Sequence, residues 1–210
     1  TSIRDYEWSS DGTRLAFTAT EPVKEAKGPL PSEPQIYEEG LKNRKGYVLD
    51  FSVSDPSPRE LEVEGTIYTL RWSPDDERLA AAVAPTPLVD DYYMRQDVGE
   101  ISASTGKVIN DNIDHEGKLD DIQWSPTGEQ LALLAGNDIH DVIAGHLMVV
   151  DAEGGKPQNI YPGFEGKFEQ IAWTSANTIH FLASESTQVG FGKIQPDGSG
   201  FSYELEPGGP

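Results

Sequence analysis

The sequence predicts an all-β protein: a β-propeller with about four blades, each a four-stranded antiparallel sheet. Three observations predict it. A tryptophan phrase recurs four times, its copies lie about 50 to 60 residues apart, and helical periodicity is nearly absent. A closed ring of seven or eight such blades needs roughly 350–400 residues, whereas this chain has 210. We therefore expect a partial ring of a larger seven- or eight-bladed propeller. A four-bladed ring, or a larger ring completed by two copies, is the alternative.

Each copy of the phrase reads as a strand ending in tryptophan, a turn of the Ser-Pro-Asp-Gly type, and a second strand that begins Leu-Ala or a variant of it. This order predicts a β-hairpin. The four tryptophans of the chain are Trp8, Trp72, Trp124 and Trp173. A tryptophan buries roughly 150–250 Å², which one small sheet cannot cover alone. We therefore expect all four to pack between neighbouring blades.

The whole chain, residues 1–210, is predicted to be one propeller domain. Its blades are expected at about residues 1–64, 65–112, 113–162 and 163–210. The first blade is longer than the others, and the surplus lies at residues 21–45, where four prolines are clustered. Proline at that density predicts an extended arm that projects from the blade. The chain starts within a repeat phrase and shows no signal peptide, so we expect a processed or excised piece.

Composition excludes several classes of function. The chain has 16 Lys and Arg against 36 Asp and Glu, a net charge of −20, which disfavours nucleic acid and anionic membranes as partners. No apolar run approaches the ~20 residues of a membrane-spanning helix. The chain contains no cysteine, so disulfides, a thiolate nucleophile and cysteine metal sites are excluded. The compartment stays open between bacterial periplasm and cytoplasm.

The phrase Trp-Ser-Pro-Asp-Gly followed by Leu-Ala-Phe resembles the blade repeat of Tol-system propellers. It also resembles the propeller domain of the prolyl oligopeptidase family of serine peptidases. Residues 84–94 and 136–155 are similar to bacterial dipeptidyl aminopeptidase or acylaminoacyl peptidase sequences. The peptidase resemblance implies a non-catalytic propeller region that gates and positions peptide substrates for an α/β-hydrolase domain of the same parent protein, a domain absent from this chain.

The catalytic serine of that family lies in a Gly-x-Ser-x-Gly elbow. This chain contains no such pentapeptide, and Ser199 stands in a Pro-Asp-Gly turn, so we expect no catalytic residue here. The main alternative is a non-enzymatic Tol-type scaffold that binds protein partners over its blade edges. A lyase or glycosidase with a metal in the central channel is a third alternative. A homo-oligomer is also open.

Two consecutive acidic residues, Glu38 and Glu39, are the candidate substrate-binding pair. The peptidase resemblance implies that such a pair on a propeller arm binds the free α-amino group of the substrate, because charge-assisted hydrogen bonds are strong. The alternative is a solvated charged arm in which Lys42, Arg44 and Lys45 neutralise the two carboxylates.

Two further segments carry polar or aromatic side chains. Asp138, His140, Asp141 and His146 include ligand types that suit zinc or manganese, but their spacing matches no metal motif, and we expect neither a metal nor another cofactor. The run at residues 90–95 is expected to be a loop between strands, with the lining of a central opening as its alternative.

Overall fold

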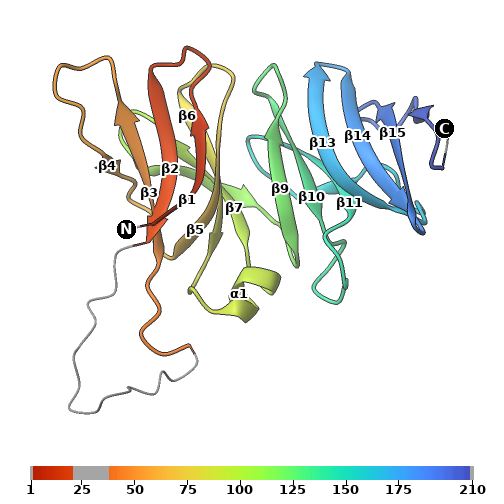
Figure 1. Ribbon diagram of the computed structural model, residues 1–210, viewed down its shortest axis with the longest axis horizontal. Helices are drawn as coiled ribbons and strands as arrows, with labels where there is room; N and C mark the ends of the chain where they lie inside the picture. The colour runs from red at the N-terminus through yellow and green to blue at the C-terminus, as the bar shows by residue number, and fades with distance from the viewer. Residues whose placement is uncertain (1, 21–37, 209–210) are drawn as a thin grey trace.

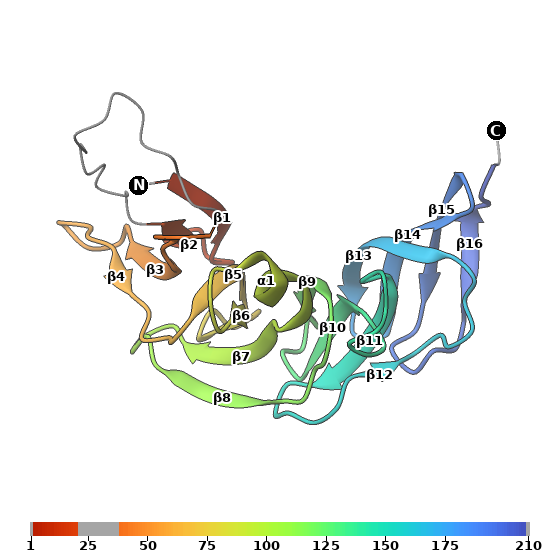
Figure 2. The ribbon, with the colours of Figure 1, turned by 90° about the horizontal axis from the view of Figure 1, so that it is seen from below.

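The computed structural model describes residues 2–20 and 38–208, which form an arc of four antiparallel sheets. In each sheet the four strands follow one another in chain order. Figure 2 shows the first strand of every sheet on the concave side of the arc and the last on the convex side. The arc does not close into a ring. The prediction of an all-β, partial propeller with four-stranded blades is confirmed.

The first two blades are built as antiparallel meanders (Figure 1). Blade 1 contains β1 (Ser2–Trp8), β2 (Arg14–Thr20), β3 (Arg44–Asp50) and β4 (Arg59–Glu60). Blade 2 contains β5 (Thr66–Trp72), β6 (Arg78–Ala84), β7 (Asp97–Ser102) and β8 (Val108–Ile113). A six-residue helix, α1 (Val89–Met94), lies between β6 and β7.

The last two blades repeat this order. Blade 3 contains β9 (Leu119–Trp124), β10 (Gln130–Ala135), β11 (His146–Asp151) and β12 (Gln158–Asn159). Blade 4 contains β13 (Lys167–Ser175), β14 (Thr178–Glu185), β15 (Gln188–Ile194) and β16 (Ser202–Leu205). In the described residues no helix is long and apolar enough to cross a membrane.

The serine after the tryptophan closes the first hairpin of blades 1 to 3. In blade 2 the hydroxyl of Ser73 accepts a hydrogen bond from the amide of Arg78 at 2.9 Å. In blade 3 Ser125 accepts in the same way from the amide of Gln130 at 3.0 Å. The side chain thus ties the two ends of the turn together, which explains why the phrase specifies a hairpin.

Hydrophobic clusters fill the spaces between blades. Side chains alternate between the two faces of a strand, and β6 shows the result: Leu79 and Ala81 belong to the cluster against blade 1, while Ala80 and Ala82 belong to the cluster against blade 3. The middle strands therefore read as continuous apolar runs, because both of their faces are buried.

The junction between blades 1 and 2 is centred on Trp72, which is only 7% exposed. Its indole Nε1 donates to the backbone oxygen of Glu7, the residue before Trp8, at 3.1 Å. The guanidinium of Arg14, six residues after Trp8, lies 4.9 Å from the centre of the Trp72 ring. Blade 1 therefore supplies an acceptor and a cation to the tryptophan of blade 2.

The turn of blade 2 adds a second link across this junction. The carboxylate of Asp76 accepts from both the amide and the hydroxyl of Ser10, each at 2.7 Å. It also accepts from the amide of Asp11 at 3.2 Å. Asp76 is buried and has a positive φ of 58°, a conformation that residues other than glycine rarely adopt.

The junction between blades 2 and 3 repeats the same contacts. Trp124 is 8% exposed and donates from Nε1 to the backbone oxygen of Arg71 at 3.0 Å. The guanidinium of Arg78 lies 4.7 Å from the Trp124 ring centre and donates to the backbone oxygen of Gly128 at 2.9 Å. Arg71 and Arg78 hold the positions in blade 2 that Glu7 and Arg14 hold in blade 1.

The junction between blades 3 and 4 is different. Gln130 stands where the other two junctions have arginine, and the buried Nε1 of Trp173 has no partner among the described residues. Here the space is filled by an aromatic cluster, in which Phe168 meets Phe181 edge to face with ring centres 5.0 Å apart. Phe201 also stacks on Phe181 at 5.1 Å.

The expected packing of the four tryptophans is therefore confirmed for Trp72 and Trp124 but is wrong for Trp8. Trp8 is 48% exposed, because each tryptophan packs on the preceding blade and no described blade lies on that side of blade 1. Trp173 is half-buried at the edge of the aromatic cluster.

Candidate functional site

A groove runs beside α1, where blades 1, 2 and 3 meet. It consists of two adjoining hollows of about 90 Å³ and about 210 Å³. The first is lined by Arg44, Tyr68, Thr69, Ala82, Tyr92, Gln96, Leu119, Asp120 and Ile122. The second is lined by Tyr92, Tyr93, Lys118, Leu119, Asp120, Val142, Ile143, Ala144 and Lys167. We call the two together the tyrosine groove, because aromatic rings form the ridge that they share.

Three tyrosines form a continuous ladder along the tyrosine groove. The ring centres of Tyr68 and Tyr92 are 4.6 Å apart with a tilt of 50°, and those of Tyr92 and Tyr93 are 5.0 Å apart in an edge-on arrangement. The guanidinium of Arg44 lies 4.6 Å from the Tyr68 ring, and the Lys118 ammonium lies 5.4 Å from the Tyr93 ring. A cation therefore stands at each end of the ladder.

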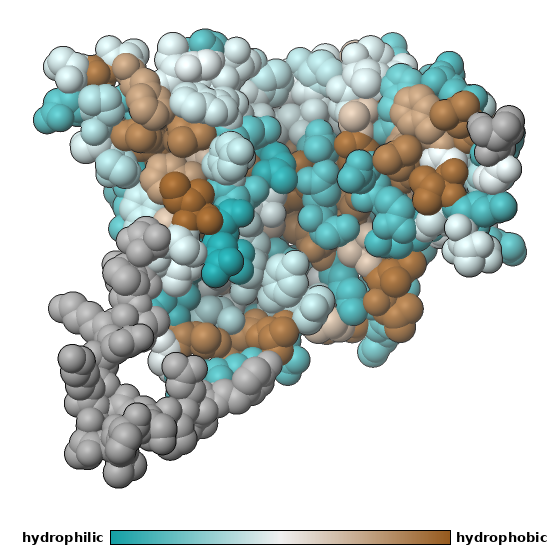
Figure 3. Space-filling view, viewed as in Figure 1, coloured by the Kyte–Doolittle hydropathy of each residue, from teal (hydrophilic) through white to brown (hydrophobic). Residues whose placement is uncertain are grey.

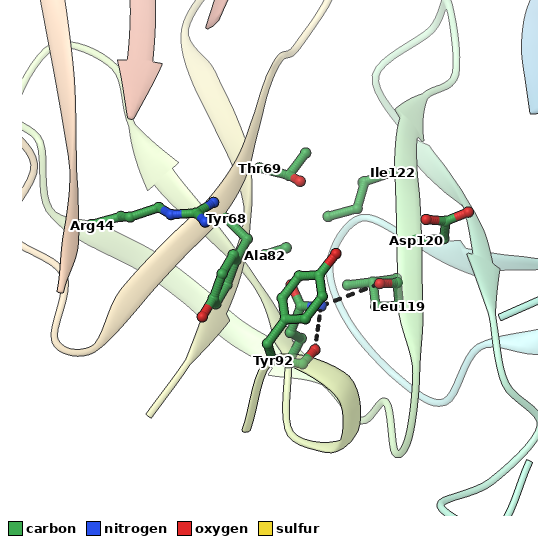
Figure 4. Close-up of a pocket in the computed structure, with 9 residues that line it drawn as sticks. Arg44, Tyr68, Thr69, Ala82, Tyr92, Leu119, Asp120 and Ile122 are labelled. Carbon is green, nitrogen blue, oxygen red and sulfur yellow. Dashed lines mark hydrogen bonds between the residues drawn. The ribbon is translucent and has the colours of Figure 1, made fainter. Parts of the chain in front are cut away.

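Helix α1 positions two of these rings. The carboxylate of Glu38 accepts a hydrogen bond at 3.2 Å from the amide of Val89, the first residue of the helix. The side-chain amide of Gln96 donates to the backbone oxygens of Tyr92 and Leu119, at 2.8 Å and 3.2 Å (Figure 4). The helix is thus held to blade 3 at one end and contacted by residue 38 at the other.

The charges of the tyrosine groove contrast with those of the chain. Neither Arg44 nor Lys118 forms an ion pair with any residue that the structure describes, although the chain has an excess of carboxylates. Lys167 is paired with Glu169 at 2.7 Å. Asp120 lines both hollows of the groove, but it forms no ion pair with a described residue. Two cations thus remain available to an anion.

The protonation state of Tyr68 suits binding. Burial raises the pKa of Tyr68, an effect that the nearby Arg44 guanidinium partly opposes. The phenol therefore stays neutral at physiological pH and keeps its hydroxyl proton as a donor. Aromatic faces, hydroxyl donors and two cations can bind an apolar chain that carries carboxylates.

The predicted substrate pair lies in a turn just before β3. Glu38 is half-buried and contacts α1, as described above, whereas Glu39 is exposed. Glu38 has a positive φ of 62°. Most of the predicted proline-rich arm, residues 21–37, lies outside the described residues. Amine binding by Glu38 and Glu39 stays a prediction.

In the histidine and aspartate segment that leads into β11, one histidine lies close to a carboxylate. His146 Nε2 lies 3.1 Å from a carboxylate oxygen of Asp141, whereas the Asp138 carboxylate accepts from the backbone amide of His140 at 2.7 Å. Within residues 2–20 and 38–208 no group of three or more potential metal ligands occurs.

Sequence reasoning located the site only in part. The sequence predicts a loop over residues 90–95, which is wrong, because Val89–Met94 is a helix. The alternative for this run, the lining of a central opening, stays a prediction; Tyr92 and Tyr93 line the groove beside α1. Nothing in the sequence around Arg44, Tyr68 or Lys118 indicates that these residues line one groove, since each comes from a different blade or connection.

No family model and no curated protein matches the sequence. Solved structures do match. The putative TolB from Agrobacterium tumefaciens superposes with a TM-score of 0.63 at 16% identity, covering 95% of this chain and 63% of that chain. TolB from Acinetobacter baumannii gives 0.59 at 15% identity, covering 96% of this chain and 42% of that chain. The chain has the fold of TolB-type propellers, and it spans less than two thirds of the length of either neighbour.

Proposed function

We propose that the chain is a non-catalytic propeller scaffold that binds an extended segment of a partner protein in the tyrosine groove. The observation that carries this proposal is the tyrosine ladder with, at each end, a cation that has no ion-pair partner among the described residues. In a protein so rich in carboxylates, cations that served stability alone would readily form internal ion pairs. The TolB-type fold supports the scaffold role.

The chemistry of the groove defines the kind of segment. The tyrosine faces suit an apolar side chain, and Arg44 and Lys118 suit carboxylates on either side of it. The net charge of −20 repels an acidic peptide at long range, but salt screens that repulsion beyond roughly 8 Å at physiological ionic strength. Short-range contacts with the two cations then decide the affinity. The segment is therefore one in which acidic and large apolar residues alternate.

Fluorescence polarisation tests this proposal directly. The probes are a fluorescein-labelled synthetic peptide of alternating glutamate and leucine or phenylalanine, and its counterpart with lysine in place of glutamate. We expect saturable binding of the acidic peptide alone. Lys118→Glu should weaken it by about 10- to 150-fold, since hydrogen bonds to charged groups contribute roughly 1.5–3 kcal/mol.

Lys156→Glu is the matched control, because Lys156 is exposed in the turn before β12 and lies outside the groove. It makes the same change of charge and should leave the affinity unchanged. Equal binding of the acidic and basic peptides, or equal loss in both variants, would contradict the proposal.

The second candidate function is substrate gating for a serine peptidase domain outside this chain. It is favoured by the peptidase resemblance and by the contact of Glu38 with α1, which places its carboxylate next to the helix that supplies Tyr92 and Tyr93. The same assay separates the two candidates. A gate with Glu38 and Glu39 as amine anchors should bind a labelled peptide with a free α-amino group and lose it on N-acetylation, while the scaffold should bind both forms equally.

A further inference from the structure

The larger hollow of the tyrosine groove brings an apolar wall and two lysines together. Tyr93, Val142 and Ile143 contribute to the wall, and Lys118 and Lys167 also line the hollow. The Lys118 ammonium lies 5.4 Å from the centre of the Tyr93 ring. A carboxylate bound by Lys118 would therefore lie beside the ring that an apolar side chain contacts.

The loop that carries the apolar wall, between β10 and β11, is held at both ends next to the two lysines. The amide of Gly136 donates to the backbone oxygen of Lys118 at 2.8 Å. The amide of Phe168, the residue after Lys167, donates to the backbone oxygen of Gly145 at 3.0 Å. The wall and the lysines are thus placed relative to one another before a ligand binds.

This loop exposes large hydrophobic side chains. Val142 is 81% exposed, Ile139 42% and Ile143 38%. Figure 3 shows hydrophobic side chains at this loop and beside α1, at the lower edge of the view. A valine so exposed contributes little to folding, whereas contact with a ligand would bury it. The loop therefore has the character of a recognition surface.

The polar groups of the larger hollow complement one another. Lys118 and Asp120 line it without an ion pair to any described residue. Lys167 donates to Glu169 at 2.7 Å, and Glu169 also accepts from the hydroxyl of Ser184 at 2.7 Å. Lys167 is therefore fixed in place and keeps further N–H donors, because an ammonium group has three. The hollow offers an ammonium for a carboxylate, a carboxylate for an N–H donor, and an apolar wall.

We propose that the larger hollow binds the C-terminal residue of the partner segment, with its free α-carboxylate and an apolar side chain. The inference rests on the proposed function and adds which end of the segment enters the groove. A terminal residue carries a carboxylate, an N–H and a side chain on or beside one Cα. An internal segment needs two residues to supply the same groups, and neighbouring side chains of an extended chain point to opposite sides.

Each part of the terminal residue then has a partner in the hollow. The α-carboxylate contacts Lys118, the side chain packs against Tyr93 and Val142, and Asp120 accepts the N–H. The rest of the segment runs from there along the tyrosine ladder towards Arg44 in the smaller hollow. The groove thus selects both the direction of the segment and its last residue.

Fluorescence polarisation with matched peptides tests the inference. The peptides carry fluorescein at the N-terminus, alternate glutamate and leucine, and end in leucine either as the free acid or as the amide. A third peptide extends the free acid by two glycines, which moves the carboxylate away from the last leucine. We expect the amide and the extended peptide to bind about 10- to 150-fold more weakly than the free acid, since a charged hydrogen bond is lost.

Two lysine and arginine variants locate the carboxylate. In Lys118→Gln the free acid and the amide should bind equally, because the group that distinguishes them is gone. Arg44→Gln is the matched control, because Arg44 lines the smaller hollow. It should weaken both peptides and leave the ratio of their affinities unchanged.

The apolar wall is tested by the choice of the last residue. Val142→Ser should reduce the preference for a free-acid peptide ending in leucine over one ending in serine. Val189→Ser is the matched control, because Val189 is 58% exposed on β15 and lies outside the groove. It should leave the preference unchanged, and neither variant removes a buried side chain.

The outcomes separate this inference from the proposed function. Equal affinities of the free acid, the amide and the extended peptide would overturn the terminal residue and leave an internal segment as the ligand. The absence of saturable binding by every peptide would overturn the proposed function as well. A large excess of free leucine should not displace the labelled free acid. Displacement by leucine at the peptide's own affinity would overturn the choice of a protein terminus in favour of a free amino acid.

Discussion

The junction between blades 2 and 3 and the junction between blades 3 and 4 join sheets of the same type by different chemistry. The first uses a tryptophan whose polar atom is satisfied and whose ring is covered by Arg78. The second buries a cluster of phenylalanines and leaves the indole of Trp173 without a described partner. One junction is thus specified by directional contacts, whereas the other depends on apolar area, which fixes no register by itself.

The largest expected effect is the loss of a tryptophan at a specified junction. Trp124→Ala should lower the free energy of unfolding by about 3–5 kcal/mol, the range for emptying an aromatic core site. Trp8→Ala should cost less than about 1 kcal/mol, because the Trp8 side chain is half exposed and no described blade packs on it. Urea denaturation followed by circular dichroism measures both. If the two variants lost similar amounts of unfolding free energy, Trp8 would be packed as tightly as Trp124, and the difference between the two positions would be refuted.

The next effect concerns the two arginines. Arg78 also pairs with the buried carboxylate of Glu100 at 3.2 Å, whereas Arg14 makes no ion pair with a described residue. Arg78→Gln should therefore cost about 3–5 kcal/mol at pH 7, since it strands a buried charge. Arg14→Gln should cost about 0.5–2 kcal/mol, the contribution of a cation over an aromatic ring.

The pH dependence of stability separates the two contacts of Arg78, its ion pair with Glu100 and its contact with the Trp124 ring. Burial raises the pKa of Glu100 above its ordinary 4.5, against the opposing effect of Arg78. The folded state therefore binds the proton more tightly than the unfolded state, and Glu100 lowers stability as pH rises above 4.5. Without Arg78 the pKa rises further, so the deficit of Arg78→Gln should be large at pH 7 and small below about pH 4.5. A deficit independent of pH would assign the loss to the Trp124 contact alone.

The smallest effect is a gain. Gln130→Arg places an arginine where the third junction lacks one, facing Trp173, and should stabilise the chain by about 0.5–1 kcal/mol. Gln130→Met is the control, because it keeps the length of the side chain without its charge. Chemical denaturation of the three proteins gives the difference. An equal gain from methionine would mean that apolar area, and not the cation, limits this junction.

The sequence predicts the hairpins and their order because the determinants are local. In Ser73 to Arg78, for example, the turn residues and the serine that closes the turn lie within six positions. The exposure of Trp8 is not predictable in this way. The phrase around it matches the others, and only its place at the end of the arc decides whether a neighbour covers it.

The tyrosine groove escapes prediction for a related reason. Arg44, Tyr68 and Lys118 come together only when three blades stack, and nothing near any of them in the sequence indicates this. Helix α1 likewise depends on a distant contact, from Glu38 to Val89. At six residues it is too short to be stable by its own propensity. Local patterns therefore indicated a loop.

Asp76 has a consequence for how the molecule unfolds. Its φ of 58° places it where blades 1 and 3 use Gly12 and Gly128, and a residue with a side chain costs roughly 1–2 kcal/mol in that region. The hydrogen bonds from Ser10 and Asp11 offset this cost, but only while blade 1 is in place. Once blade 1 detaches, the turn of blade 2 keeps its backbone strain, while the Asp76 carboxylate exchanges the donors of blade 1 for water. Blades 1 and 2 should therefore open as one cooperative unit, and their amides should exchange hydrogen together.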